Sequence, residues 1–412
     1  AGTFTPTANT EDASNTLSLA TSYTDTAGNA GPAATTANYA VETLAPTISS
    51  VTAGWGTSLN ATEDNSAGTV TVVTSGAENG QTVTVSLNGT NYTGTVSDNS
   101  TSVTVATTGL QALTDGSSYT LTTNVSDAAG NAATENTGTS FTYDITAPTL
   151  AETTLVPSLT NDNSTQYTFS SSEGGTISVG GNCSSDNNTA VADNMTVSFA
   201  ALADGTYHDC TITVTDSAGN SVTLDVNSFT IDTTAPTLAE VTAVTTPTND
   251  NTSSYTFSST EAGTISYSIC GGNLDNASED NNTIIFDALA DDTYSDCQIS
   301  VTDNASNTSD NLSVSSFKID TVKPVLEQVT AVTTPTDNTT PAYSFSSTEA
   351  GTNSYGGSCG SSSTSATSSG LDNVTIILTQ PDNSTALSEA QYADCSITVT
   401  DPAGNPSTAL LV

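Results

Sequence analysis

The 412-residue sequence predicts an all-β protein, a series of small β-sandwich domains that follow one another along the chain. Three observations predict it: short segments of alternating apolar and polar residues, turn motifs that recur about every ninety residues, and a low apolar content. Hydrophobic residues make up 34% of the chain, which suits thin sandwiches whose strands each turn one face to water. No segment has helical periodicity, and no apolar stretch is long enough for a membrane helix.

A turn motif of the form D-x-A-G-N recurs along the chain. Its copies begin at Asp25, Asp127, Asp216, Asp303 and Asp401, which are 102, 89, 87 and 98 residues apart. The copy at Asp303 carries serine in place of glycine. A repeat of this length matches one small β-sandwich domain of about 100 residues.

A second motif, which contains proline, marks the joints between repeats. Its prolines are Pro46, Pro148, Pro236 and Pro324, which are 102, 88 and 88 residues apart. Proline is tolerated at the start of a first strand, and its fixed φ stiffens the joint. We therefore expect part of a domain at 1–44, a domain at 45–145, domains with one disulfide each at 146–233 and 234–321, and a disulfide-containing domain at 322–412 that is truncated at its last strand.

Residues 236–320 illustrate the pattern within one repeat. We expect strands at 237–245, 254–259, 264–269, 283–286, 297–302 and 312–319, with a corner at 289–294 before the D-x-A-G-N hairpin. About seven short strands in fewer than 90 residues are typical of an immunoglobulin-like sandwich.

Two strings carry a family resemblance, TVTDSAGN at 213–220 and FTIDTTAP at 229–236. They resemble the Ig-like repeats of giant bacterial surface adhesins and biofilm-matrix proteins, and the resemblance extends over the whole chain. It implies tandem Ig-like domains arranged as an elongated rod and used mainly as spacers. The cysteine pairs and the near absence of lysine and arginine depart from the usual repeats of that class.

The charge balance is extreme, with 43 acidic residues against 2 basic ones and a net charge of −41. Nucleic acid is excluded as a partner, and an anionic lipid surface is disfavoured, because both need lysine and arginine. Salt or divalent cations relieve the self-repulsion of such a chain. Two explanations stay open: solubility in salty surroundings, and calcium binding in addition to it.

Six cysteines form three consecutive pairs, with spacings of 27, 27 and 36 residues. The absence of a C-x-x-C motif argues against zinc. One pair in each of the last three repeats predicts one disulfide in each of them and an extracellular or cell-surface location, although six reduced, buried thiols are the alternative. The predicted disulfides are Cys183–Cys210, Cys270–Cys297 and Cys359–Cys395.

The resemblance implies calcium at the joints, and the topology of an Ig-like sandwich gives an independent reason. The linker from the preceding domain, the loop between the second and third strands, and the hairpin between the last two strands meet at one pole. The predicted ligand sets are Asp144, Glu173 and Asp216; Asp232, Glu261 and Asp303; and Asp320, Glu349 and Asp401, with a less well aligned set of Glu42, Glu78 and Asp127. Carboxylates and loop carbonyls are the ligands that Ca²⁺ prefers. The alternative is that these acids are solvated turn residues.

Four tyrosines, Tyr119, Tyr207, Tyr294 and Tyr392, each follow a polar turn and precede the hairpin strand. They resemble a tyrosine corner, in which the hydroxyl group bonds nearby backbone. Asn-x-Ser/Thr triplets are frequent, so attached glycans are a further candidate partner.

No constellation of catalytic residues is found. His208 is the single histidine and has no equivalent in the other repeats, which argues against a Ser-His-Asp or Cys-His mechanism. The acidic pair Asp291-Asp292 lies in a recurrent turn, which favours a scaffold over a glycosidase. We therefore expect no enzyme.

The sequence predicts a non-catalytic stalk of a bacterial cell-surface or extracellular adhesin, with calcium-stiffened repeats as spacers. The alternative is a subunit of an extracellular filament, sheath or surface layer assembled from the repeats. A carbohydrate-binding array is a third idea, and the single tryptophan, Trp55, weakens it. Self-association, or a host or matrix ligand, would involve regions outside this segment, and no membrane insertion is expected within it.

Overall fold

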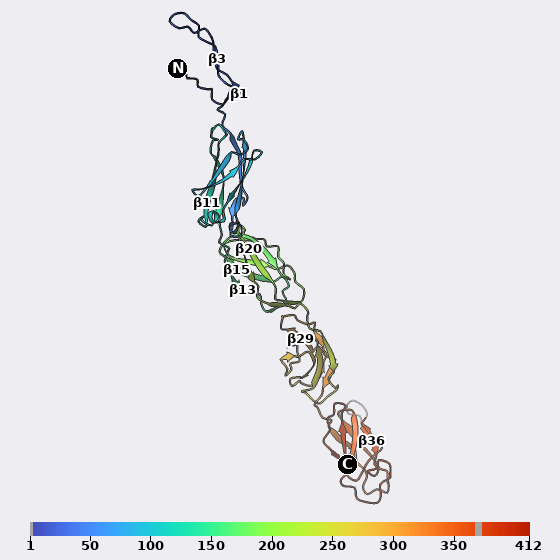
Figure 1. Cartoon of the computed structure of the whole chain (residues 1–412). Helices are drawn as coiled ribbons and strands as arrows, with labels where there is room; N and C mark the ends of the chain where they lie inside the picture. Colours follow the sequence, from blue (N-terminus) through green and yellow to red (C-terminus); the bar gives the residue numbers. More distant parts are fainter. Residues whose placement is uncertain (1–2, 367–372) are drawn as a thin grey trace. The chain divides into compact units, whose positions relative to one another are not determined.

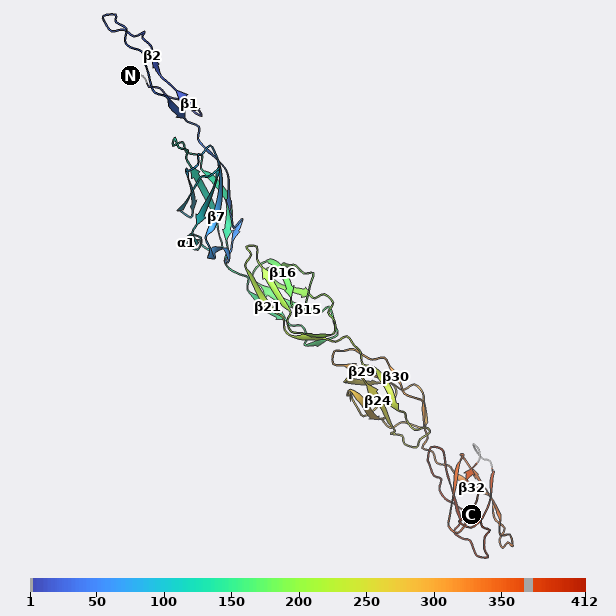
Figure 2. The same cartoon turned by 45° about the vertical axis from the view of Figure 1, so that its right-hand side comes forward.

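The computed structural model describes residues 3–366 and 373–412. The chain forms two compact units, one made of Ala1–Ser158, Ser164–Leu202 and Thr206–Phe229, the other of Leu159–Asn163, Ala203–Gly205 and Thr230–Val412. Strands are found in every repeat of both units (Figures 1 and 2). Among the described residues, helix is limited to the four residues of α1 (Thr107–Leu110) and the 3₁₀ turn η1 (Glu63–Asn65). The all-β prediction is confirmed, and none of these helices could span a membrane.

Residues 3–44 form two antiparallel strand pairs. Their strands are β1 (Glu11–Asn15), β2 (Ser18–Leu19), β3 (Ala34–Thr35) and β4 (Tyr39–Glu42). Strand β1 pairs with β4, and β2 pairs with β3, both antiparallel. Leu17, Leu19 and Tyr23 are exposed here, whereas Leu121 and Val125, which precede the next copy of the turn at the matching distances, are buried.

Residues 47–143 form a complete two-sheet sandwich. Its strands are β5 (Thr47–Ala53), β6 (Ser58–Leu59), β7 (Gly68–Ser75), β8 (Thr82–Leu87), β9 (Thr90–Thr95), β10 (Ser100–Val105), β11 (Ser117–Val125) and β12 (Asn136–Tyr143). The sheets have the orders β10-β7-β5 and β6-β12-β11-β8-β9. Alternation along β7 buries Val70 and Val72, and Trp55 packs edge-on against Phe141 with ring centroids 5.3 Å apart. This core consists only of residues between Pro46 and Pro148.

The third repeat has the same plan with shorter strands. They are β13 (Leu150–Thr154), β14 (Leu159–Thr160), β15 (Gln166–Ser171), β16 (Gly175–Gly180), β17 (Thr189–Ala190), β18 (Asp193–Ser198), β19 (Gly205–Tyr207), β20 (Thr211–Thr215), β21 (Ser221–Asp225) and β22 (Phe229–Ile231). In the first unit the sheets are β13-β15-β18 and β17-β16-β20-β21. Tyr167, Phe169, Ile212 and Val214 are buried between them.

The fourth repeat lies wholly in the second unit. Its strands are β23 (Leu238–Thr242), β24 (Ser254–Ser259), β25 (Gly263–Tyr267), β26 (Asn276–Ala277), β27 (Asp280–Ile285), β28 (Asp292–Tyr294), β29 (Gln298–Asp303), β30 (Leu312–Ser313) and β31 (Phe317–Ile319). They form the sheets β23-β24-β27, β26-β25-β29-β30 and β28-β31. Tyr255 and Phe257 are fully buried in its core, as the alternation along 254–259 predicts.

The fifth repeat follows the same order. Its strands are β32 (Leu326–Thr330), β33 (Ala342–Ser347), β34 (Gly351–Gly356), β35 (Ser365–Ala366), β36 (Asn373–Ile377), β37 (Ser396–Thr400) and β38 (Leu410–Leu411). The sheets are β32-β33-β36 and β35-β34-β37-β38. Tyr343, Phe345, Ile397 and Val399 occupy its core.

The prediction of one strand at 312–319 was wrong. Strand β30 pairs with β29, whereas β31 pairs with β28, so the chain changes sheets between them. At the crossing point, the backbone N–H and the hydroxyl group of Ser315 both donate to the Glu240 carboxylate, at 2.9 and 2.7 Å. This side chain from β23 thus holds the interrupted backbone, a contact that alternation along the strand does not show.

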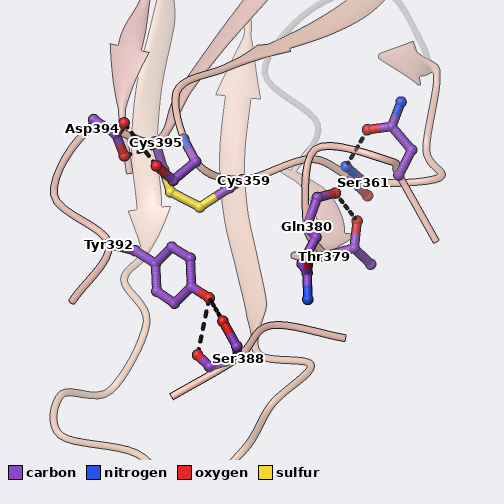
Figure 3. Close-up of a disulfide and its surroundings, with 10 residues drawn as sticks. Cys359, Ser361, Thr379, Gln380, Ser388, Tyr392, Asp394 and Cys395 are labelled. Carbon is purple, nitrogen blue, oxygen red and sulfur yellow. Dashed lines mark hydrogen bonds between the residues drawn. A yellow bond between two sulfur atoms is a disulfide. The ribbon is translucent and has the colours of Figure 1, made fainter. Parts of the chain in front are cut away.

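The three predicted disulfides are present, and their Cα atoms are 5.3, 5.4 and 5.2 Å apart. Figure 3 shows Cys359–Cys395 next to Tyr392, whose hydroxyl group donates to the Ser388 carbonyl at 2.9 Å. The Tyr294 hydroxyl makes the same bond to the Ala290 carbonyl at 3.0 Å. The Tyr119 hydroxyl instead accepts from the Thr114 N–H at 2.7 Å. These three contacts confirm the tyrosine-corner prediction at these positions.

Removal of one disulfide tests how much a disulfide contributes to the stability of its repeat. A loop of 27 residues predicts that the double variant Cys270→Ser/Cys297→Ser loses about 3–4 kcal/mol of unfolding free energy in the fourth repeat. Scanning calorimetry should show one transition moving to lower temperature. Residues 45–145 contain no cysteine, so their transition is the internal control. A shift of every transition, or of none, would contradict this account.

Candidate metal centres

The aspartate that opens each D-x-A-G-N motif builds the turn itself. In the third repeat, Oδ1 of Asp216 accepts the backbone N–H groups of Ala218, Gly219 and Asn220 at 2.8, 2.7 and 2.9 Å. Gly219 has a φ of 98°, a conformation that glycine adopts without cost. Three donors on one oxygen fix the carboxylate at the pole of the sandwich.

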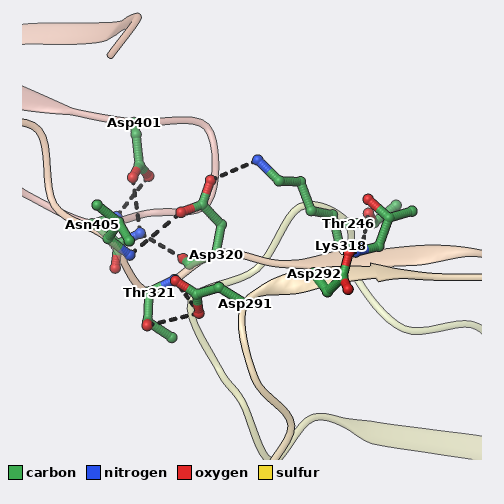
Figure 4. Close-up of polar contacts among 10 residues, drawn as sticks. Thr246, Asp291, Asp292, Lys318, Asp320, Thr321, Asp401 and Asn405 are labelled. Carbon is green, nitrogen blue, oxygen red and sulfur yellow. Dashed lines mark hydrogen bonds and ion pairs between the residues drawn. The ribbon is translucent and has the colours of Figure 1, made fainter. Parts of the chain in front are cut away.

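The asparagine that closes each motif fastens the turn to the preceding linker. Nδ2 of Asn220 donates to Oδ2 of Asp216 at 3.0 Å and to the backbone carbonyl of Asp144 at 2.9 Å. The equivalent linker bonds are Asn131 to Glu42 at 3.2 Å, Asn307 to Asp232 at 2.8 Å and Asn405 to Asp320 at 2.7 Å. Figure 4 shows Asn405 between Asp401 and Asp320. This role of the asparagine was not predicted, although the residue closes every copy of the motif in the sequence.

The glutamate of each site is set by a serine turn. Ser171, Ser259 and Ser347 donate their hydroxyl groups to the backbone carbonyls of the glutamates two residues further on, at 2.7, 2.6 and 2.6 Å. In this way each glutamate is placed at the same position in its loop.

Three predicted ligand sets come together. In each set, one oxygen from every carboxylate lies within 4.8 Å of the others, and both the linker acid and the glutamate are partly buried. The turn aspartates Asp216, Asp303 and Asp401 are only 7%, 8% and 5% exposed. The sets are Asp144, Glu173 and Asp216 in the first unit, and Asp232, Glu261 and Asp303 together with Asp320, Glu349 and Asp401 in the second. Over the described ranges, Glu42, Glu78 and Asp127 do not form such a group, and the Glu78 carboxylate accepts the Ala128 N–H at 2.9 Å instead.

The electrostatics show that these carboxylates are crowded. Burial, followed by repulsion from the neighbouring acids, raises the pKa of Glu173, Glu261 and Glu349. Burial likewise raises the pKa of Asp144. An anionic carboxylate that loses water without gaining a cation is destabilised, so a bound cation would relieve each site.

The donor set fits a hard divalent cation. Oδ2 of each turn aspartate accepts a hydrogen bond from the amide of the closing asparagine. A carboxylate oxygen has two lone pairs, so this oxygen can still bind a cation. Three carboxylates together with backbone carbonyls supply the six to eight oxygens that Ca²⁺ takes. No histidine or cysteine belongs to the three sets, which argues against zinc or copper.

A second aspartate holds each linker without contributing to the three sets. Oδ1 of Asp204 accepts the N–H and the hydroxyl group of Thr233 at 3.0 and 2.7 Å, and Oδ2 accepts the Thr234 hydroxyl group at 2.8 Å. These bonds lower the pKa of Asp204. Asp115 with Thr146, and Asp291 with Thr321, repeat the contact. The sequence predicts Asp291 only as part of the corner at 289–294 and of an acidic pair, so this contact with the linker was not predicted.

The turn also contacts the end of the preceding repeat. Nδ2 of Asn60 donates to the Ala218 carbonyl at 2.9 Å. Asn161 makes the same side-chain bond to the Ser306 carbonyl at 3.2 Å, and the Asn249 N–H donates to the Ala403 carbonyl at 3.0 Å. Each joint is therefore bonded on two sides of the same turn.

A sequence profile of the bacterial Ig-like domain matches residues 154–233, which confirms the predicted resemblance to bacterial Ig-like repeats. No curated protein matches the chain. A solved chain described as a Ca²⁺-stabilized adhesin that helps an Antarctic bacterium reach out and bind ice is 22% identical, covers 89% of this chain and 97% of its own, and has a TM-score of 0.32. A tetra-tandem repeat from the extending region of a large adhesion protein is 16% identical, with 89% and 98% covered and a TM-score of 0.29. A 1.5-MDa bacterial ice-binding adhesin is 21% identical, with 66% and 96% covered and a TM-score of 0.29.

The linker bond can be tested without metal. Asn307→Ala removes the side-chain bonds to the Asp232 carbonyl and to Oδ2 of Asp303 and should lower the unfolding free energy of the fourth repeat by about 1–3 kcal/mol in chelator. The exposed Asn311 in the same repeat bonds only a side chain, Gln298, so Asn311→Ala should change stability by less than about 0.5 kcal/mol. Calorimetry of the two variants measures the difference. Equal losses would show that these two bonds of Asn307 contribute nothing to stability.

The crowded glutamates predict a pH dependence in metal-free protein. Their pKa is raised above 4.5 in the folded chain, so the folded state takes up protons first as the pH falls toward that range. Folded stability should therefore rise as the pH is lowered from neutral toward 4.5. Thermal unfolding of metal-free protein should show a smaller rise for the Glu173→Gln/Glu261→Gln/Glu349→Gln variant. If the stability of the native protein and of the variant changes equally with pH, the repulsion among the carboxylates is absent.

Proposed function

We propose that the chain is a non-catalytic stalk of a bacterial cell-surface or extracellular adhesin, whose repeats act as calcium-stiffened spacers. One observation carries the proposal: three successive joints have the same acidic set, held by the same turn and fastened to the preceding linker by the same asparagine. A stalk built from repeats needs the same structure at every joint, and these three joints share one. A catalytic site, in contrast, has no need to recur in each repeat.

The joints give the proposed domain bounds. We assign one Ig-like domain each to 45–145, 146–233, 234–321 and 322–412, and we assign 1–44 to strands of a further Ig-like repeat. Separate hydrophobic cores between the joint prolines support this division. The disulfides support an extracellular location.

Each of three calcium ions would be held by three residues, which makes nine ligand residues in all. These are Asp144, Glu173 and Asp216; Asp232, Glu261 and Asp303; and Asp320, Glu349 and Asp401. The linker acid comes from one domain, while the glutamate and the turn aspartate come from the next. An ion bound by all three therefore links two domains and restricts bending between them.

The alternative, a filament or surface-layer subunit, is favoured by one observation. Exposed apolar side chains recur at matching positions on the outer strands of two repeats, as Val241 with Ile285 and Val329 with Ile377. Serine and threonine side chains of the intervening strands β24 and β33 separate the members of each pair. These patches are small, so the stalk is the function that we favour.

Small-angle scattering tests the stalk directly. Removal of calcium should increase flexibility and reduce the maximum dimension of the native chain. The Glu173→Gln/Glu261→Gln/Glu349→Gln variant should already scatter like the chelated protein. Three exposed glutamates, Glu135, Glu327 and Glu389, provide a control with the same change of charge. The calcium clamp is wrong if the chelator leaves the flexibility and maximum dimension of the native chain unchanged. It is also wrong if the control variant scatters like the site variant.

A further inference from the structure

The chain has only two basic residues, and both lie close in sequence to the third acidic set. Lys318 precedes Asp320 by two positions in F-K-I-D, and Lys323 follows it by three. The two earlier linkers carry threonine at the position of Lys318, as Thr142 before Asp144 and Thr230 before Asp232. Side chains two residues apart in a strand point to the same side, so a lysine here is directed toward the acidic set.

The structure shows this contact. Nζ of Lys318 lies 2.8 Å from Oδ2 of Asp320, and it is the one ion pair within residues 3–366 and 373–412 (Figure 4). The Lys318 side chain is 53% exposed, whereas that of Asp320 is 19% exposed. Both residues line a cavity of about 220 Å³ together with Glu349, Pro247 and Ala403. The ammonium group is therefore at the edge of the third site.

The interaction is not limited to one carboxylate. Glu349 lines the same cavity as Lys318 and Asp320, and ligand oxygens of Asp320, Glu349 and Asp401 lie within 4.8 Å of one another. All three members of the third set thus act on the same ammonium group, which is a cation already bound at this joint. The sets at Asp144 and Asp232 have no lysine or arginine within the matching linker.

We infer that Lys318 is a built-in counter-ion that makes the third joint the weakest of the three calcium sites and the one that depends least on the metal. This inference rests on the proposed calcium clamp. With the ammonium in place, the formal charge of the set is −2 instead of −3. The electrostatic free energy that favours binding of a divalent ion is therefore smaller. Without metal, the same ammonium reduces the repulsion among the carboxylates.

The consequence is a graded stalk. As calcium falls, the third joint should lose its ion first, yet it should loosen least, because Lys318 still compensates part of its charge. The joints at Asp144 and Asp232 should keep their ions to lower calcium concentrations and then lose rigidity more sharply.

The test uses the full chain with the first two sites weakened by Glu173→Gln and Glu261→Gln. In this background, Lys318→Thr copies the residue of the other linkers, and calorimetric titration with CaCl₂ should show about two- to tenfold tighter binding at the third site. Lys323→Thr removes the same charge from the same joint without removing the ion pair, and should change the affinity less than Lys318→Thr. In a chain with Glu173→Gln and Glu349→Gln, Thr230→Lys should weaken binding at the middle site by a similar factor.

The outcomes separate the two proposals. Equal effects of Lys318→Thr and Lys323→Thr, or no effect of either, would overturn the counter-ion inference while leaving the clamp intact. If the native chain takes up no calcium at any joint, the clamp itself fails, and the counter-ion inference fails with it. Differential scattering of native and Lys318→Thr chains in chelator gives a second readout, since the variant should be the more flexible one.

Discussion

One buried carboxylate at each joint serves two neighbouring repeats. The aspartate that opens the D-x-A-G-N turn caps the turn with one oxygen and binds the closing asparagine with the other. That asparagine in turn bonds the linker carbonyl of the repeat before it. The same aspartate is also the most buried member of the acidic set. The fold of the hairpin, the attachment of the linker and the candidate metal site therefore depend on one side chain.

Stability within a repeat and stability between repeats have different physical sources. Within a repeat, aromatic and β-branched residues fill a small core. In the last three repeats a disulfide also restricts the conformations of the unfolded chain. Between repeats, each joint has side-chain hydrogen bonds from the closing asparagine to the linker and a cluster of three carboxylates. Cations and pH should therefore act mainly on the joints, while reduction acts mainly on the cores.

Much of this organisation could be predicted from the sequence. Alternation along 254–259 predicted a strand that buries Tyr255 and Phe257, and the cysteine spacing predicted the disulfides. The three acidic sets followed from knowing which loops of an Ig-like sandwich share a pole. The change of sheet at Ser315 could not be predicted, because it depends on Glu240, 75 residues away. The hydrogen bond from Thr233 to Asp204 could not be predicted either. Nothing in the sequence distinguishes this carboxylate from the other acidic residues in turns.

We propose that a cation occupies the acidic set at each joint and is shared by two repeats. A crystal structure of residues 146–321 grown with calcium tests it most directly. We predict a density peak bonded to Asp232, Glu261 and Asp303, with oxygen distances of about 2.3–2.6 Å and six to eight ligands. A well-ordered joint that holds only water among these three carboxylates, at millimolar calcium, would contradict the account.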